Sequence, residues 1–515
     1  MQSEILKGNS KLSRSELVIL IMSAIVTITF VSTSSPLYPY NPWDDANCFF
    51  TLGRGIIHGY VPYRDLYEQK GPLLYFIYAL AALISEESFI GSWIVECISA
   101  SLFAIFSWKT AKLVVEPSKY AIAVMPLFLG ITYTLYMFNF GGNAEEICFP
   151  LLTIALYFGL KSIIKGDGLP SNKEALLIGL FTGIVFWIKY TFLGFFAGFC
   201  LYILVLTIKR KSFVKLWSLV WRFLLGIIII SIPVLIYFAA NKALDSLWEA
   251  YFYNNMFLYH SGAKAHGLAA IPVIKNIYIP FKATLKLSKE YPTYGIMLFL
   301  SLISLVFIGK PHRRKAVCLF LVTFALALSV IYTRLVLIYY YGYIMAYCFC
   351  LTLIPAIKLL NYIAKASKDH SAFIKRLATG GLLITYVFTI IMCKNMYLIF
   401  KPKDYLAQYR MAATINQTPD AKILTYEVMD SGFFTVAGLM PANRFYCYLN
   451  IQNSYPAILE EQHRLIDEGY YDYIVTDYFC EGAWDNYELI QTETIFCVDY
   501  TGKAFLEGFK LYKRI

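Results

Sequence analysis

Residues 217–240 read WSLVWRFLLGIIIISIPVLIYFAA, with Arg222 as their single charged side chain. A helix needs about 17–25 mostly apolar residues to cross a bilayer, so this stretch predicts a membrane span. The whole chain has the same character, with 58% hydrophobic and 15% charged residues and a mean hydropathy of +0.56. Soluble domains have about 45–50% apolar and about 25% charged residues. The sequence therefore predicts an α-helical polytopic membrane protein.

Comparable apolar runs recur through residues 1–400. Besides 217–240, they occupy 17–36, 90–108, 120–138, 147–164, 174–189, 190–208, 291–309, 316–332, 335–357 and 377–399. The stretch 174–208 holds two spans only if it folds as a tight pair of helices that turns near Lys189 and Tyr190. Residues 72–84 are apolar but too short to span, so we expect a helix along the outer interface. These runs predict about eleven transmembrane helices.

Basic residues in the connecting loops predict how the chain is oriented. Cytoplasmic loops are enriched in Lys and Arg, and basic loops alternate here at 109–112, 161–165, 209–211, 310–315 and 358–376. The segment 241–290 also contains lysines, but long loops follow the rule weakly. We expect a multi-pass protein of the cell membrane with a cytoplasmic N-terminus, an uncleaved first span and an extracytoplasmic C-terminus. These loops account for the net charge of +11, so we expect no nucleic-acid partner.

The character of the chain changes near residue 401. Short segments at 421–426, 471–477, 487–498 and 509–513 have the pattern of strands, and 456–468 has helical spacing. They predict a small extracytoplasmic α/β domain over 401–515, beside a transmembrane domain over 1–400. The 11 cysteines include no CxxC pair, which argues against a zinc site or a disulfide framework.

The first outward loop, residues 37–89, contains the richest group of chemically active side chains. Its central part, residues 41–78, reads NPWDDANCFFTLGRGIIHGYVPYRDLYEQKGPLLYFIY. Charged residues alternate there with aromatic residues that would hold the loop against the membrane. A plain connecting loop would also be polar, so the mixture is the informative feature. The charged members are Asp44, Asp45, Arg54, Asp65, Glu68 and Lys70.

This loop resembles the first extracytoplasmic loop of GT-C superfamily glycosyltransferases, which include protein O-mannosyltransferases and the lipid A aminoarabinose transferase. In that family an acidic residue or pair follows the first span, and an aromatic residue lies four positions later. A glycine-rich helix, a Tyr-Arg-Asp-like turn and a Lys-Pro-Pro or Lys-Gly-Pro sequence come next. The matching positions, in order, are Asp45 with Phe49, the glycines of 53–59, Tyr63-Arg64-Asp65 and Lys70-Gly71-Pro72. Asp44 precedes the aligned carboxylate, so the choice between the two stays open.

Two later segments extend the resemblance. The outward loop 141–146, Gly-Gly-Asn-Ala-Glu-Glu, leads into a span, and the family often places an acidic residue there, at the mouth of the same cavity. Arg334 precedes three tyrosines at 339–341, where relatives have a basic or polar residue and a Tyr-aromatic pair. The resemblance covers the whole chain in topology and is motif-specific over 41–78 and 141–150.

The resemblance implies an inverting glycosyltransferase that uses a polyprenyl-phosphate-linked sugar. A carboxylate within hydrogen-bond reach activates an acceptor hydroxyl as a general base, and Lys or Arg stabilises the departing lipid phosphate. Asp45, or Asp44, becomes the candidate base. Glu145, with Glu146 beside it, would orient the acceptor, bind a metal or share the base role. The substrate-binding candidates are Arg64, Asp65, Lys70, Arg334 and Tyr340.

The expected partners follow from this chemistry. They are a lipid-linked sugar donor, membrane lipid, and a glycan, lipid or protein acceptor of the cell envelope. No cofactor is specified by the sequence. A divalent cation is an open possibility, because four carboxylates could supply the oxygen ligands that such ions prefer: those of Asp44, Asp45, Glu145 and Glu146.

Each candidate residue also has a structural interpretation. Asp45 could cap a helix over 46–58, and Lys70 could extend from an interfacial helix toward the membrane surface. Glu145 and Glu146 could be favourable charges at the start of a span. For Lys189, at the turn of a helical pair, we expect a lysine that extends to the interface. Arg334 could be an interfacial anchor.

Two other functions are compatible with a polytopic chain. A transporter or flippase of lipid-linked glycans would bury ionisable groups near the bilayer midplane and often contains internal repeats. Here the carboxylates lie in outer loops, and no repeat is evident. A non-catalytic envelope assembly protein with a degenerate site is the second alternative.

Overall fold

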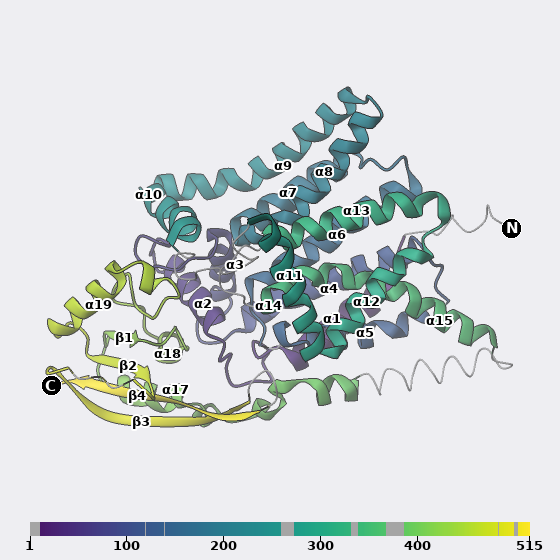
Figure 1. Ribbon diagram of the computed structural model, residues 1–515. Coiled ribbons are helices and arrows are strands. Elements are labelled where there is room, and N and C mark those ends of the chain that lie inside the picture. Colours follow the sequence, from purple (N-terminus) through teal and green to yellow (C-terminus); the bar gives the residue numbers. More distant parts are fainter. Residues whose placement is uncertain are drawn as a thin grey trace.

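The computed structural model describes residues 11–118, 120–138, 140–258, 272–330, 338–366, 386–480, 482, 484–498 and 503–515. A bundle of helices forms most of the molecule, and a small mixed domain with the C-terminus packs at one end of it (Figure 1). The described N-terminal part begins at the opposite end. This arrangement confirms the predicted helical fold with a C-terminal α/β domain.

Two helices of the bundle have N-terminal ends that are fixed by the local sequence. Ser13 caps α1 (Arg14–Val31), and Ser171 caps α7 (Asn172–Lys189). Each serine accepts a hydrogen bond from the backbone N–H of a glutamate three residues on, and that glutamate bonds back to the serine N–H, as in a capping box. The other helices of the bundle are α4 (Ile90–Lys112), α5 (Met125–Tyr133), α6 (Ala144–Lys165), α8 (Leu193–Lys209), α9 (Phe213–Ala240), α10 (Leu244–Leu247), α11 (Pro272–Glu290), α12 (Pro292–Ser304), α13 (Lys310–Val330), α14 (Ile338–Ala346) and α15 (Leu353–Ala366).

Within the described residues, six helical stretches are long and apolar enough to cross a membrane. They are Arg14–Val31, Ile90–Lys112, Ala144–Lys165, Asn172–Lys209, Phe213–Ala240 and Tyr340–Lys365. Shorter apolar helices occur at Pro72–Ala82, Ala121–Tyr133 and Pro292–Phe307. Several predicted spans are therefore interrupted, and much of the predicted span 377–399 lies outside the described residues.

The predicted pair of helices in 174–208 is confirmed. α7 ends at Lys189, a single turn of 3₁₀ helix covers Tyr190–Phe192, and α8 begins at Leu193. The free end of α8 returns to the start of α7, because Arg210 Nη1 lies 3.1 Å from Asp167 Oδ2 in the loop before α7. The turn at Lys189 is thereby placed at the opposite end of the pair.

The first long loop folds into two helices, α2 (Asp44–Ile57) and α3 (Pro72–Ala82). The predicted helix start at residue 46 is two residues too late, because Asp44 and Asp45 already lie inside the first turn. Gly53 of α2 faces the α3 backbone so closely that a Cβ there would lie 2.5 Å from the Tyr78 carbonyl carbon. Only glycine allows this contact, so the two helices are packed tightly together.

The C-terminal domain is built on a four-stranded sheet with strand order β1-β2-β4-β3. β1 (Ile423–Tyr426) is parallel to β2 (Tyr473–Asp477), and β4 (Ala504–Arg514) pairs antiparallel with β2 and with β3 (Tyr487–Val498). The helices of this part are α17 (Ala407–Ile415), α18 (Phe433–Val436) and α19 (Ala457–Asp467). All four predicted strands and the predicted helix are present, with β4 longer than expected.

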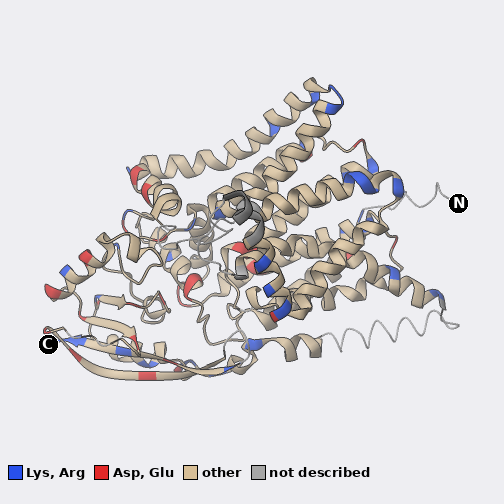
Figure 2. Cartoon of the chain, viewed as in Figure 1, with Lys and Arg blue, Asp and Glu red and all other residues tan. Residues whose placement is uncertain are grey.

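Charged residues are unevenly distributed over the bundle. Figure 2 shows Lys and Arg at helix ends far from the sheet, including the turn between α8 and α9 and the start of α13. The last turns of α4, α6, α8 and α15 are also basic. The sheet domain and the basic helix ends therefore lie on opposite sides of the apolar bundle.

Candidate active site

The N-terminus of α2 presents Asp45 toward Lys70. The Asp45 Oδ1 atom lies 3.8 Å from Lys70 Nζ, and the side chains are 17% and 16% exposed. Trp43 occupies the N-cap position without a side-chain cap, so the capping interpretation of Asp45 is wrong. Lys70 also lies over the Phe49 ring, with Nζ 5.3 Å from the centroid. Asp45, Phe49 and Lys70 of the predicted motif are thus brought together.

Lys70 is held by its neighbours rather than extended freely to the membrane surface. Its Nζ lies 3.5 Å from Glu68 Oε1, and its backbone N–H donates to Glu68 Oε2 at 2.7 Å. Tyr75 donates a further hydrogen bond to the same carboxylate. The next residue, Gly71, donates from its N–H to Ile188 O at 3.0 Å. The interpretation of Lys70 as a purely interfacial lysine is therefore wrong.

A second pair of opposite charges comes from the spanning helices. Lys189, at the end of α7, is hydrogen-bonded to Glu145 in the first turn of α6. The Lys189 and Glu145 side chains are only 9% and 3% exposed. The Tyr340 ring lies against the ammonium group, 3.9 Å from centroid to Nζ. The expectation that Lys189 extends to the interface is wrong, because its side chain is buried against the Glu145 carboxylate inside the bundle.

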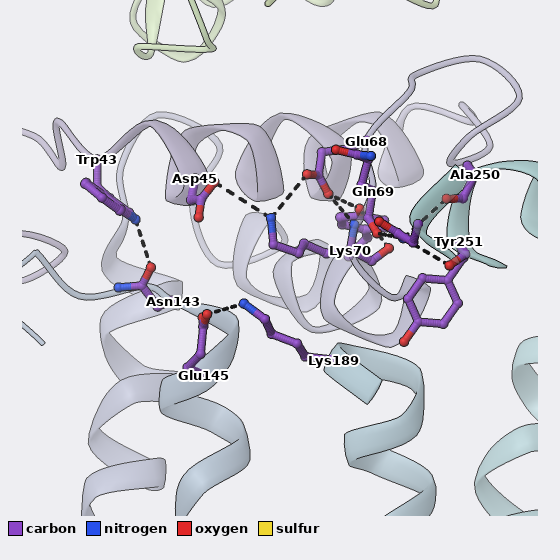
Figure 3. Close-up of polar contacts among 12 residues, drawn as sticks. Trp43, Asp45, Glu68, Gln69, Lys70, Asn143, Glu145, Lys189, Ala250 and Tyr251 are labelled. Carbon is purple, nitrogen blue, oxygen red and sulfur yellow. Dashed lines mark hydrogen bonds and ion pairs between the residues drawn. The ribbon is translucent and has the colours of Figure 1, made fainter. Parts of the chain in front are cut away.

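Figure 3 shows the two pairs facing the same space. One pair comes from the first turn of α2 and the segment before α3, and the other comes from the adjoining ends of α6 and α7. Burial is the largest influence on Asp45 and raises the pKa of its carboxyl, while the Lys70 charge acts in the opposite direction. Burial also lowers the pKa of Lys70, but the carboxylates of Asp45 and Glu68 outweigh it and hold that pKa well above its ordinary value. Lys70 is therefore a permanent cation beside a carboxylate that binds protons more readily than usual.

Glu146 makes different contacts from its neighbour Glu145. Its Oε1 atom accepts a hydrogen bond from Asn143 Nδ2 at 3.3 Å and one from the Tyr343 hydroxyl at 3.4 Å. Asn143 in turn accepts from Trp43 Nε1 at 2.8 Å. Glu146 is 3% exposed. It therefore fixes the start of α6 against the loop that contains Asp45.

Asp44 and Asp45 are neighbours in sequence but face different partners. Ser431 Oγ, in the C-terminal domain, donates to Asp44 Oδ1 at 2.8 Å. Burial raises the pKa of Asp44 to about 8, with a further contribution from the Glu507 charge. The geometry thus separates two residues between which the sequence could not choose.

Arg64 and Asp65 form a surface ion pair, with Arg64 Nη2 2.7 Å from Asp65 Oδ2. Arg64 Nη1 also donates to Asn241 O at 2.8 Å, and Asp65 accepts from Val61 N at 2.7 Å. These contacts stabilise the turn between α2 and α3. Arg334 lies outside the described residues.

Among the described residues, no three His, Cys, Asp or Glu side chains come together in a way that could hold a metal ion. The carboxylates of the site are instead matched with lysines or with the C-terminal domain. We therefore assign no chemical step to a metal. Sequence reasoning missed the pairing of Lys189, because its partner Glu145 comes from a distant segment. It also missed the supporting role of Glu68, whose partners Lys70 and Tyr75 are close to it in the chain.

Two comparisons bear on this geometry. Residues 69–237 match the family described as dolichyl-phosphate-mannose-protein mannosyltransferase. Two crystal structures of ArnT from Cupriavidus metallidurans have a similar fold. The undecaprenyl-phosphate-bound structure has a TM-score of 0.53 at 10% identity over 96% of this chain and 98% of that one. The apo structure has a TM-score of 0.55 at 11% identity over 95% and 97%.

Residues 69–237 are thus similar to a mannosyltransferase family, and the fold of the chain is similar to that of ArnT. No curated protein matches its sequence significantly. The family match includes Lys70, Glu145 and Lys189, whereas Asp45 lies before it. The structural likeness extends over nearly the whole of both chains, including the C-terminal domain. Together with the six apolar helical stretches, this likeness supports a multi-pass membrane protein.

Proposed function

We propose that this GT-C enzyme transfers a sugar from a polyprenyl-phosphate-linked donor to a cell-envelope acceptor at the outer face of the membrane. The observation that carries the proposal is the Asp45–Lys70 pair, 3.8 Å apart and partly open to solvent. A carboxylate and a fixed cation are the two groups that this transfer requires. Support for the donor class comes from ArnT, which has been crystallised with undecaprenyl phosphate.

In the proposed reaction Asp45 is the general base. It accepts the proton of the acceptor hydroxyl while that oxygen bonds to the anomeric carbon and the bond from this carbon to the lipid phosphate breaks. Lys70 stabilises the negative charge that returns to the phosphate. In this proposal the acceptor hydroxyl attacks the anomeric carbon from the side opposite the leaving phosphate, so the transfer inverts the configuration of that carbon. Lys70 needs no proton exchange for this role, since Asp45 and Glu68 keep it charged.

Glu145 and Lys189 would form the floor of the site. Their buried pair, covered by Tyr340, adds a cation beneath the space that Asp45 and Lys70 face. The phosphate of the donor would lie between the two lysines, and Glu145 would orient the acceptor or the second lysine. The acceptor could be a glycan, a lipid or a protein.

The proposed orientation places the site outside the cell. Basic helix ends favour the cytoplasmic side of a membrane, and here they lie opposite the sheet domain (Figure 2). The N-terminus would then be cytoplasmic and the C-terminal domain extracytoplasmic. Cysteine labelling of intact cells within 445–480 tests this orientation, and labelling only after permeabilisation would reverse it.

The catalytic assignment is tested with purified protein and a polyprenyl-phosphate sugar donor. Asp45→Asn keeps the size of the side chain but removes the base, so transfer should fall by about 10²–10⁴. The thermal melt and donor binding should stay close to wild type. Full activity of Asp45→Asn would refute the assignment and favour a transporter of lipid-linked glycans, for which flipping of the same lipid in vesicles is the direct assay.

A further inference from the structure

One face of α2 is bound to the C-terminal domain along its length. Asp44, Thr51 and Arg54 repeat at intervals of seven and three residues, so they lie along one side of the helix. Ser431 donates to Asp44 at 2.8 Å, and Thr51 donates to Asp430 Oδ2 at 2.5 Å. Arg54 Nη1 donates to the carbonyl oxygens of Phe434 at 3.1 Å and Leu439 at 3.2 Å. All of these hydrogen bonds are made to a single segment of the C-terminal domain, residues 430–439.

The 430–432 turn is itself rigid where it meets α2. Asp430 accepts a hydrogen bond from the Gly432 N–H at 2.9 Å, and Gly432 has a left-handed φ of 96°. A Cβ on this residue would lie 2.1 Å from the Tyr40 hydroxyl oxygen, so only glycine fits. That same hydroxyl donates to Asn47 of α2. Asp430 and Ser431 are 0% and 2% exposed; the hydrogen bond from Thr51 to Asp430 is buried, and the one from Ser431 to Asp44 is partly buried.

The opposite face of α2 leads to the reaction centre. Asp45 faces Lys70, Phe49 lies under the Lys70 ammonium group, and Gly53 contacts the α3 backbone. These positions repeat at intervals of four residues and form the second side of the helix. α2 is thus held between the 430–439 segment and the site. Asp44 fixes the rotation of the same helical turn that presents Asp45.

We infer that Ser431 and Asp430 are positioning residues for the general base, acting through Asp44 and Thr51 of α2. This inference rests on the proposed role of Asp45. A base must lie within hydrogen-bond reach of the acceptor proton, and a misplacement of about 1 Å costs about a hundredfold in rate. The C-terminal domain therefore does more than cover the membrane domain: it sets the direction of the catalytic carboxylate. Neither residue touches substrate in this arrangement.

The test uses the full-length protein and the polyprenyl-phosphate sugar assay. Ser431→Ala and Thr51→Val each remove one hydrogen bond, and each should lower kcat about ten- to a hundredfold. The KM for the donor should stay within about twofold, because Lys70 and Lys189 are untouched. Ser431→Thr and Thr51→Ser restore a hydroxyl and should recover most of the rate. Thr414→Val is the matched control, since Thr414 donates to Gln491 at 2.6 Å within the C-terminal domain.

A double-mutant cycle separates positioning from a general loss of structure. In an Asp45→Asn background the positioned group is gone, so adding Ser431→Ala should cause no further loss of residual activity. An equal loss in both backgrounds would refute the inference, as would wild-type kcat in both Ser431→Ala and Thr51→Val. If Asp45→Asn itself is fully active, the proposed base fails, and that result is distinct from failure of the positioning contacts alone.

Discussion

Two carboxylate–lysine pairs face the same space, and they differ in almost every physical respect. Asp45 and Lys70 come from the first outward loop, which contains α2 and α3; they lie 3.8 Å apart and are about one-sixth exposed. Glu145 and Lys189 come from the spanning helices, are in direct contact and are almost fully buried. An open, loosely matched pair can exchange its partner for a substrate at little cost. A buried pair cannot, because separating its charges leaves one of them unsolvated.

The comparison suggests a division of labour within one site. The loop pair supplies the groups that act on the substrate, while the helix pair fixes the tops of α6 and α7 below it. The pair in the helices also places positive charge where a phosphate would approach. The following variants break one pair at a time, beginning with the largest expected effect.

Lys189→Met should destabilise the protein most strongly. Removing one partner of a buried ion pair costs about 3–5 kcal/mol, because Glu145 is left as an isolated buried charge. The melting temperature of the purified protein should fall accordingly. The double variant Glu145→Gln with Lys189→Met should recover much of the loss, since neither charge remains.

Lys161→Met is the matched control for this measurement. Lys161 pairs with Glu174 at 2.8 Å but is 39% exposed, and exposed pairs contribute at most about 1 kcal/mol. Suppose that Lys189→Met melted like the wild type and lost activity as completely as a Lys70 variant. The contrast between the two pairs would then be false, and Lys189 would act on the substrate without the structural role assigned to it.

Lys70→Ala should have a smaller effect, and on rate rather than on folding. The loss of one electrostatic contact to the leaving phosphate costs about 10²–10³ in rate. The melt should change little, because the pair is partly open and Glu68 keeps its bonds to Tyr75 and the backbone. Lys112→Ala is the control, since Lys112 lies in the last turn of α4 and pairs with Glu16 rather than with a residue of the site. Unchanged transfer by Lys70→Ala would leave Lys70 with a structural role only.

The difference between the pairs also shows what the sequence could predict. The turn at Lys189 and the four strands follow from local composition and periodicity, and each is found in the structure, as are six long apolar helical stretches within the described residues. The motif places Asp45 and Lys70 in one site, because only a helix and a short loop separate them in the chain. Local patterns are enough where the contact is made within one segment.

Contacts between distant segments were not predictable. The position of Lys189 at the turn of a helical pair predicts an interfacial side chain, and only the packing of α6 against α7 shows that it pairs with Glu145. Asp44 and Asp45 have the same local surroundings, and Asp44 is distinguished only by Ser431 in the other domain. The helix start was misplaced for a related reason: the first turn of α2 is fixed by these tertiary partners, with no capping side chain.

The smallest expected effect concerns the pH dependence of the open pair. Burial raises the pKa of Asp45, and the Lys70 charge opposes that rise. A general base acts only when deprotonated, so the rate should fall as pH decreases through this pKa. Removing the cation in Lys70→Met takes away the opposing influence, and the pKa of Asp45 should rise further. The acid limb of the pH–rate profile, measured on the residual activity, should therefore move to higher pH.

The direction of this shift follows from the geometry, because a nearby opposite charge favours the ionised form of a carboxyl group and Lys70 Nζ lies 3.8 Å from Asp45 Oδ1. Lys112→Met, which removes a lysine far from the site, should leave the acid limb in place. An unmoved limb in Lys70→Met would mean that the titrating group is not Asp45. A carboxylate elsewhere would then limit the rate, and Glu145, paired with its own lysine, would become the stronger candidate for the base.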